Sequence, residues 1–328
     1  MGKLVICTGS DSNLFYLAKG LVLSLRRVLP LYDAELAFFD LGCTRQELAW
    51  LQAYSVNVLK PKDDFGIANA EGFKSYMFGQ TCRPMLPGYL PGRSTYLWLD
   101  ADTWVQDGSV IEDFVAIAAE GKAAAVLELD PSYPWYFRRA SAFHGYKIKQ
   151  WTAAFGPEVA RQLHLATLLN SGVLAMSGDS PLWKRWGDNL ALSLTRGPTH
   201  LSEQLALQKT LMESNAFFPM AARHNWMCHY ALPQRRRSDG LWVEPRPSGQ
   251  PIGIVHLVSS DMRETYLRHG LLYDGGDYLL PEEVPEGLRA AFLAGRRRPL
   301  LVRSRRQGRL GMMRSRRDKQ PKQQPNQQ

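Results

Sequence analysis

Short aliphatic and β-branched runs alternate with longer amphipathic stretches over the first 130 residues, and this alternation restricts the fold more than any other feature. The short runs predict strands and the longer stretches predict helices. The predicted strands are 3–7, 35–39, 56–59, 95–99 and 123–127, and the predicted helices are 14–29, 45–53, 73–82 and 110–120. Such alternation is typical of a mainly parallel sheet with helices on both faces, so the predicted fold class is α/β.

The second half of the chain continues the pattern less regularly. The further predicted elements are strands at 170–177 and 253–258 and helices at 202–213 and from Pro181 onward. Asp179 is the predicted N-cap of the helix that begins at Pro181, whereas Thr44 and Glu47 form a T-x-x-E capping box further upstream. An aromatic and basic insert, 133–151, precedes these elements.

Two polar segments directly follow predicted strands, namely 8–13 (TGSDSN) and Asp100–Ala101–Asp102. Ligands bind open α/β sheets beyond the carboxyl ends of the strands. We therefore expect the two segments to line one cleft although they lie far apart in the sequence.

The carboxylates of Asp100 and Asp102 come straight after the apolar run YLWL. Neighbouring carboxylates repel unless a cation or hydrogen-bond donors compensate. An Asp-x-Asp pair also occurs in ordinary turns at strand ends. A buried strand that delivers both groups to a pocket suits a hard divalent cation, which takes oxygen ligands and often binds phosphate oxygens as well.

The composition restricts the class of protein. The four cysteines show no C-x-x-C spacing, which argues against a disulfide framework or a zinc ribbon. His224 and His229 around Cys228 have loose metal-like spacing, but no second cluster supports a zinc site. No apolar run reaches the roughly 18 residues of a membrane helix, and the first residues turn polar too early for a secretory signal. We expect a cytoplasmic protein.

The net charge of +9 comes from the end of the chain. Residues 296–328 hold twelve Lys or Arg and a single Asp, a local charge of +11, which leaves about −2 for the rest. This Gln-, Pro- and Arg-rich composition cannot support a core, so we expect a solvated tail. It could dock on an anionic membrane surface; nucleic acid is the less favoured partner.

Five segments of the chain resemble a glycosyltransferase of the GT-A fold, most like glycosyltransferase family 8, in their order and in the separations between them. The segments are ICTGSDSNLFYLAKGLVLSL, YLWLDADTWVQD, LLNSGVLAMS, SEQLALQ and VHLVSSDMR. The resemblance implies that a sugar moves from a nucleotide diphosphate donor, typically a UDP-sugar of the Glc, Gal or GlcNAc type, with retention at the anomeric carbon. The acceptor would be a glycan, a lipid-linked sugar or a small molecule.

The resemblance also assigns site residues. It gives Asp100, Asp102 and His256 to the metal, usually Mn²⁺ in this family and alternatively Mg²⁺. The residues that it implies for the donor are Thr8, Asp11, Asn13, Arg83, Asp100, Ala101, Asp102 and Arg263. Arg263 stands beside Met262, near the place of a lysine that family members often carry, and we expect it to contact the diphosphate. Without the resemblance, His256 would be a core histidine, Arg83 a surface arginine, and Ser12 or Asn13 a helix cap.

Three residues are assigned to the reacting sugar. Asn170 in NSGVL corresponds to an asparagine that faces the sugar, with Ser171 and Gly172 allowing close backbone approach. Glu203 and Gln204 occupy the place of an acidic or amide pair beside the anomeric carbon. We expect one of them to stabilise that centre without a lasting covalent bond. A solvated helix face is the alternative for this pair.

The insert 133–151 is the predicted acceptor platform, because aromatic faces stack on sugar rings. Tyr133, Trp135 and Arg138 are the residues chosen, with Lys147 as a further phosphate contact. Core packing of these aromatic residues is the alternative. The predicted catalytic domain is 1–285, with a donor half, 1–130, and an acceptor half, 131–285, followed by a short helix and tail at 286–328.

Other functions stay open at this point. A sugar nucleotidyltransferase would show a Gly-rich basic loop after the first strand, and CTGSDSNLF has none. A non-catalytic nucleotide-sugar binder and a binder of anionic surfaces through the basic tail are the alternatives.

Overall fold

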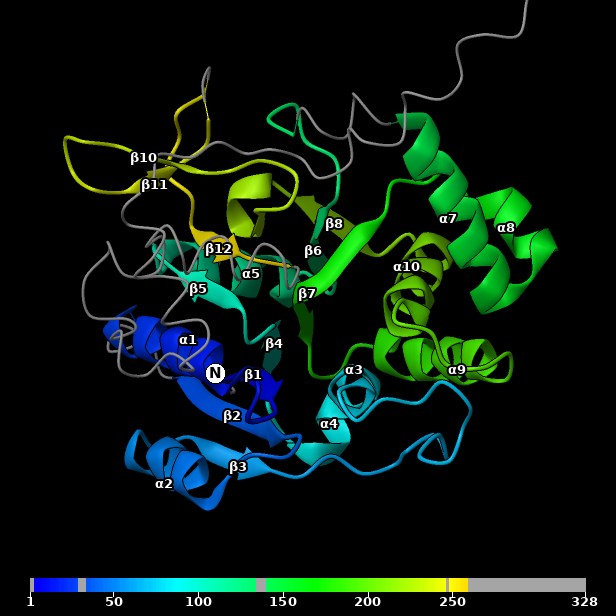
Figure 1. Ribbon diagram of the computed structural model, residues 1–328, viewed down its shortest axis with the longest axis horizontal. Coiled ribbons are helices and arrows are strands. Elements are labelled where there is room, and N and C mark those ends of the chain that lie inside the picture. Colours follow the sequence, from blue (N-terminus) through cyan, green and yellow to red (C-terminus); the bar gives the residue numbers. More distant parts are fainter. Residues whose placement is uncertain (1–2, 29–33, 134–139, 246–247, 259–328) are drawn as a thin grey trace, which may run out of the picture.

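The computed structural model describes residues 3–28, 34–133, 140–245 and 248–258 (Figure 1). The strands are β1 (Leu4–Ser10), β2 (Ala34–Asp40), β3 (Asn57–Leu59), β4 (Thr95–Leu99), β5 (Thr103–Val105), β6 (Ala123–Leu127), β7 (Leu169–Ser177), β8 (Phe217–Met220), β9 (Trp226–Met227), β10 (Gln234–Arg235), β11 (Trp242–Val243) and β12 (Ile254–His256). The helices are α1 (Phe15–Val28), α2 (Arg45–Ala53), α3 (Met77–Thr81), η2 (Arg83–Met85), α4 (Leu86–Tyr89), α5 (Ser109–Ala119), α7 (Ala140–Phe155), α8 (Pro157–Leu163), α9 (Leu182–Leu194), α10 (Ser202–Ser214) and η3 (Ala222–His224).

A seven-stranded sheet with the order β3-β2-β1-β4-β7-β6-β8 forms the centre of the molecule. β7 is antiparallel to both of its neighbours, and the other four pairings are parallel. This confirms the predicted α/β class with a mainly parallel sheet. A second, three-stranded sheet has the order β5-β12-β9 and joins the segment after β4 to the last described strand.

Apolar side chains leave the central sheet on both faces, because successive residues of a strand point to opposite sides. On one face, Ile6 and Leu97 pack with residues of α1 and α5. On the other, Cys7 and Trp98 pack with residues of α9 and α10, which lie side by side in Figure 1. The two cores make the sheet a rigid support for the residues at its edges.

Several predicted elements are confirmed. The strands 95–99 and 123–127 have the predicted limits, and the capping box is present, with Thr44 Oγ1 accepting from the Glu47 N–H. β1 runs further than predicted, because Thr8 to Ser10 continue the pairing with β2.

The region 73–89 differs from the prediction of one helix ended by prolines. Only Met77–Thr81 is α-helical there. Pro84 and Pro87 lie in the first turns of η2 and α4, where a missing N–H costs no hydrogen bond. The Asp179 cap is also wrong, because Ser177 Oγ donates to the Asp179 carboxylate, and Ser180 Oγ accepts from the Leu182 N–H instead.

Some predictions lie outside the described residues. These are Arg263, Trp135, Arg138, the domain boundary at 285 and the basic tail 296–328. Within the part of the chain that the structure describes, every helix is too short or too polar to span a bilayer.

Candidate metal and donor site

The turn after β4 places two carboxylates at the carboxyl end of the sheet. The Asp100 N–H donates to the Gly172 carbonyl (2.7 Å), and the Asp100 carbonyl accepts from Thr103 N (2.9 Å) and Thr103 Oγ1 (2.7 Å). This tight turn starts β5, which pairs with β12 so that Thr103 lies opposite His256. The Leu257 N–H also donates to the Asp102 carbonyl (3.2 Å). Thr103 and His256, which are 153 positions apart in the sequence, are thereby brought together.

Asp100, Asp102 and His256 form one cluster. His256 Nε2 lies 3.3 Å from Asp102 Oδ1 and 3.8 Å from Asp100 Oδ2. One ligand atom from each residue lies within 4.8 Å of the other two. Asp102 and His256 are buried, while Asp100 is partly exposed. Carboxylate oxygens and an imidazole nitrogen suit Mn²⁺ or another divalent ion, so the residues present fit the predicted metal.

The tautomer of His256 follows from a chain of hydrogen bonds that begins at a backbone N–H. The Gly172 N–H donates to Asn170 Oδ1 (3.0 Å), which also accepts from Asn225 Nδ2 (2.9 Å). Asn225 Oδ1 is therefore the atom that faces His256 Nδ1 (2.8 Å), and Nδ1 carries the proton. The lone pair of Nε2 then faces the two carboxylates, as a metal-binding imidazole requires.

Arg83 compensates the charge of Asp100 from inside the protein. Its Nη2 lies 2.5 Å from Asp100 Oδ1, which also accepts from Trp98 Nε1 (2.8 Å). The guanidinium lies 4.7 Å over the Trp98 ring and is buried. Asp100 thus uses Oδ1 for protein donors and keeps Oδ2 on the side of His256. The predicted contact between Arg83 and the donor stays a prediction.

Glu203 at the start of α10 is a second anion for Arg83. Its Oε2 accepts from Ser171 Oγ (3.0 Å) and Arg83 Nη1 (3.3 Å), and its Oε1 has no hydrogen-bond partner among the described residues. The side chain is only 2% exposed. Burial raises the pKa of Glu203 to about 7, although Arg83 acts in the opposite direction. The carboxyl group therefore titrates near neutral pH.

This pKa predicts a pH-dependent component of stability. A carboxyl whose pKa is about 7 in the folded chain and near 4.5 in the unfolded chain binds more protons when folded. The free energy of unfolding should therefore fall by up to roughly 3 kcal/mol as the pH rises from about 4.5 to about 7. Glu203→Gln should lose this component in urea unfolding at pH 5 and pH 7.5. Glu213→Gln, an exposed carboxylate of the same helix, should keep it. Equal pH slopes in the wild type and Glu203→Gln would contradict the assignment.

Gln204 and Asn170 share a partner that the sequence analysis missed. Gln204 Nε2 (3.2 Å) and Asn170 Nδ2 (3.4 Å) both donate to Glu128 Oε1, while Tyr230 Oη donates to Glu128 Oε2 (2.7 Å). Burial raises the pKa of the Glu128 carboxyl, and these three hydrogen bonds act to lower it. A signal existed, because Glu128 directly follows the strand 123–127 just as Asp100 follows 95–99. Asn225 carries no comparable signal.

The first loop lies at the same edge of the sheet. β1 and β4 are parallel neighbours with Cys7 opposite Trp98, so Thr8 and Asp100 both follow this pair. This confirms the expected proximity of the two segments. Thr8 Oγ1 is buried and has no hydrogen-bond partner among the described residues. Asp11 Oδ1 accepts from the N–H groups of Asn13 (3.0 Å) and Leu14 (3.2 Å), so Asp11 caps this turn instead of Ser12 or Asn13.

The predicted acceptor platform needs correction. Tyr133 is fully buried, its Oη accepts from the Met227 N–H (3.2 Å), and its ring packs against Trp226. Tyr133 therefore offers no face to a sugar. Lys147 is also buried, with Nζ donating to the Ala166 carbonyl (3.0 Å). Both belong to the core, which is the alternative reading of this segment.

The histidines near Cys228 do not form a metal site. His224 Nε2 lies 2.8 Å from Asp113 Oδ2, and neither His224 nor His229 belongs to a group of three metal-ligating residues within the described residues. In the described ranges, the cluster of Asp100, Asp102 and His256 is the one group of three such residues close enough to hold an ion.

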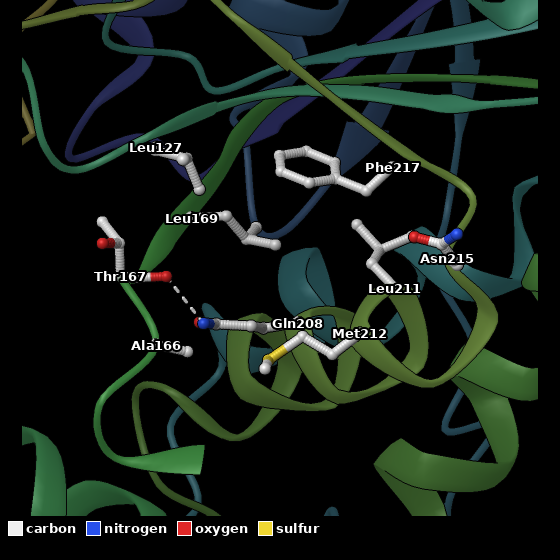
Figure 2. Close-up of a pocket in the computed structure, with 9 residues that line it drawn as sticks. All are labelled: Leu127, Ala166, Thr167, Leu169, Gln208, Leu211, Met212, Asn215 and Phe217. Atoms are coloured by element: carbon white, nitrogen blue, oxygen red, sulfur yellow. Dashed lines mark hydrogen bonds between the residues drawn. The ribbon is translucent and has the colours of Figure 1, made fainter.

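A cavity of about 330 Å³ lies apart from this cluster, among β6, β7, α10 and β8 (Figure 2). Leu127, Leu169, Leu211 and Phe217 form much of its wall, and Gln208 Nε2 donates to the Thr167 carbonyl there (2.7 Å). None of the predicted site residues lines it. The cavity therefore does not contribute to the candidate site.

Comparisons with known proteins identify the fold. No family model matches the chain, and no curated protein matches it. A crystal structure of the galactosyltransferase LgtC with donor and acceptor sugar analogues has a TM-score of 0.54 at 17% identity, covering 88% of this chain and 99% of that chain. An active-site mutant of LgtC has a TM-score of 0.52 at 16% identity, with the same coverage. The bifunctional glycosyltransferase WbbM, without ligand, has a TM-score of 0.52 at 10% identity and covers 79% of this chain and 46% of that chain.

At these identities the likeness concerns the fold. The chain has the GT-A fold, with a mixed α/β architecture and a mainly parallel central sheet. One fold can host more than one activity, and the residues of the site determine which activity a chain has.

Proposed function

We propose that the chain is a metal-dependent glycosyltransferase that moves a sugar from a UDP-sugar to an acceptor with retention of anomeric configuration. The observation that carries this proposal is the cluster of Asp100, Asp102 and His256 at the ligand-binding edge of a GT-A fold. LgtC, which has a similar fold, has been crystallised in complex with donor and acceptor sugar analogues. Family 8 is the proposed family, on the resemblance of the five sequence segments.

The residues proposed for the donor either hold the metal ion or bind the nucleotide. Asp100, Asp102 and His256 would hold Mn²⁺ or Mg²⁺, and the bound ion would neutralise the charge that grows on the leaving diphosphate. Thr8, whose buried hydroxyl lacks a partner among the described residues, would bind the nucleotide together with the loop after it.

On the sugar side, Gln204 is the better choice for stabilising the anomeric centre. Glu203 Oε2 is already held by Ser171 and Arg83, so this carboxylate is a counter-charge for Arg83. The Gln204 amide donates its Nε2 hydrogen to the Glu128 carboxylate, which leaves the Gln204 amide oxygen without that contact. We therefore propose electrostatic stabilisation by Gln204 without a covalent intermediate. A glycosyl-enzyme trapped and seen by mass spectrometry would contradict this.

Arg263 would contact the diphosphate, and Trp135 and Arg138 would contact a glycan, lipid-linked or small-molecule acceptor. A cytoplasmic chain held at an anionic membrane surface by the tail 296–328 is part of the same proposal.

The test is turnover of UDP-glucose, UDP-galactose and UDP-N-acetylglucosamine in the presence of Mn²⁺, with released UDP as the readout. Water acts as the acceptor, so an unidentified acceptor is not needed. We expect one donor to be favoured, the anomer released first to be the α form, and Asp102→Asn to lower turnover at least about 100-fold. Equal turnover in Asp102→Asn would contradict the proposal. Binding of a UDP-sugar without any turnover would favour a nucleotide-sugar-binding protein.

A further inference from the structure

Glu128 is a buried carboxylate in hydrogen-bond contact with Gln204 and Asn170, the residues assigned to the reacting sugar. It follows β6, is 7% exposed, and accepts hydrogen bonds from three side chains, as described above. Two of the three donors, Gln204 and Asn170, are the residues proposed to face the sugar. The third, Tyr230, closes the other side of the carboxylate.

The acceptor atom Oε1 of Glu128 decides which way the Gln204 amide points. Glu128 Oε1 also accepts from Asn170 Nδ2, and the Gly172 N–H fixes the orientation of that amide. Because Oε1 is thus an acceptor, Gln204 must present Nε2 to it and turn its own Oε1 away. The described residues give the Gln204 side chain no other hydrogen bond. With Glu128 removed, nothing in the described part of the site would distinguish the two amide orientations, and an inverted amide would present N–H groups instead of an oxygen.

The metal side does not depend on Glu128 in the same way. Asn170 Oδ1 accepts from the Gly172 backbone N–H as well as from Asn225, and these bonds fix its orientation without Glu128. The chain from Asn170 through Asn225 to His256 therefore remains when Glu128 is changed. Glu128 should affect the sugar step and leave metal and nucleotide binding unaltered.

We propose that Glu128 is a positioning residue for sugar transfer, which holds the Gln204 amide with its oxygen toward the donor sugar. This inference rests on the proposed function, because it gives Gln204 the anomeric centre. Glu128 does not itself touch the substrate. Its contribution is the orientation of a neutral side chain that would otherwise take either of two orientations.

The test compares Glu128→Met, which removes the acceptor, with Glu128→Gln, which keeps an amide oxygen for Gln204 and can donate to Tyr230. With the UDP-sugar that the wild type hydrolyses fastest, Glu128→Met should lower kcat about 100-fold. The KM and the affinity for UDP with Mn²⁺ should stay within about threefold of the wild type, and Glu128→Gln should retain most of kcat. Glu244→Gln, another buried carboxylate, is the matched control and should behave as the wild type. If Glu128→Gln is as impaired as Glu128→Met, the charge itself acts and the positioning role is wrong.

A double-variant cycle separates positioning from a general structural effect. If Glu128 acts through Gln204, Glu128→Met together with Gln204→Ala should be no worse than Gln204→Ala alone. A loss of kcat in the double variant equal to the product of the losses in the two single variants would overturn the proposal. Should Glu128→Met fail to fold in a thermal scan, Glu128→Asp replaces it, because the shorter side chain withdraws its oxygens from Gln204.

A spectroscopic readout works without any donor. The Gln204 side-chain NH₂ signals, assigned with Gln204→Glu, should be protected from solvent exchange in the wild type and in Glu128→Gln, and altered in Glu128→Met. Unaltered signals in Glu128→Met would overturn the inference. Absence of turnover in the wild type would instead count against the proposed function, and the amide signals would still decide the role of Glu128.

Discussion

Gly172→Ala is expected to abolish metal-dependent nucleotide binding while the fold is kept. A Cβ at this position would lie 2.5 Å from His256 Cε1, 2.6 Å from Asp100 Oδ2 and 2.9 Å from Asn170 Oδ1. All three atoms belong to the candidate site, and real Cβ contacts are not this short. The added methyl group can be accommodated only if the side chains of Asp100 and His256 move away from it. The affinity for UDP in the presence of Mn²⁺ should therefore fall at least about 100-fold. The stability cost of the added methyl should be about 1–3 kcal/mol.

The matched control is Gly145→Ala, where the new Cβ meets nothing within 4 Å. This glycine lies inside α7, so alanine should favour the helix by about 1 kcal/mol, with unchanged UDP binding. Calorimetric titration of both variants, with urea unfolding beside it, separates the site effect from stability. Wild-type UDP affinity in Gly172→Ala would show that the three residues do not act as a metal site.

Arg83→Met is expected to destabilise the chain strongly. It removes the cation between Asp100 (2.5 Å) and Glu203 (3.3 Å), and the second of these carboxylates is only 2% exposed. Removing one partner of a buried ion pair costs roughly 3–5 kcal/mol. Without Arg83, Asp100 loses its cation, and Glu203 either keeps an uncompensated charge or takes up a proton at pH 7.5. The free energy of unfolding from urea titration at pH 7.5 measures this loss.

Two further variants control this prediction. Arg83→Met combined with Glu203→Gln should recover part of the stability, because the buried charge is then absent, but not nucleotide binding. Arg93→Met breaks the more exposed pair with Glu35 (2.7 Å) and should cost about 1 kcal/mol. A loss in Arg83→Met no greater than that in Arg93→Met would contradict the role given to Arg83.

The alternation of strand and helix patterns predicts the parallel part of the sheet well, because each unit there is a local strand followed by its helix. The pattern says less about 73–89, since Pro84 and Pro87 start short helices as readily as they end a long one. β5 is too short for its own periodicity to be seen. β5 forms because the turn after Asp100 places Thr103 opposite His256 in β12, which is the last described strand.

The candidate site was only partly predictable for a similar reason. Asp100 and Asp102 follow a clear apolar strand, and His256 was chosen through the family resemblance. The compensation of Asp100 by Arg83 depends on tertiary contacts between η2 and β4, which no local pattern records. Tyr133 shows the opposite error, because an aromatic residue in a polar insert can equally belong to the core. Glu128 had a local signal, as the residue directly after the strand 123–127, whereas Asn225 becomes significant only once its hydrogen-bond partners are known.

The central claim is that Asp100, Asp102 and His256 hold a divalent ion that binds a nucleotide diphosphate. The most direct measurement is calorimetric titration of UDP with and without Mn²⁺, on the wild type and on the Asp100→Ala, Asp102→Ala double variant. We predict UDP binding that requires Mn²⁺ in the wild type and is absent in the double variant under both conditions. UDP binding that is independent of Mn²⁺, or that persists in the double variant, would contradict the claim.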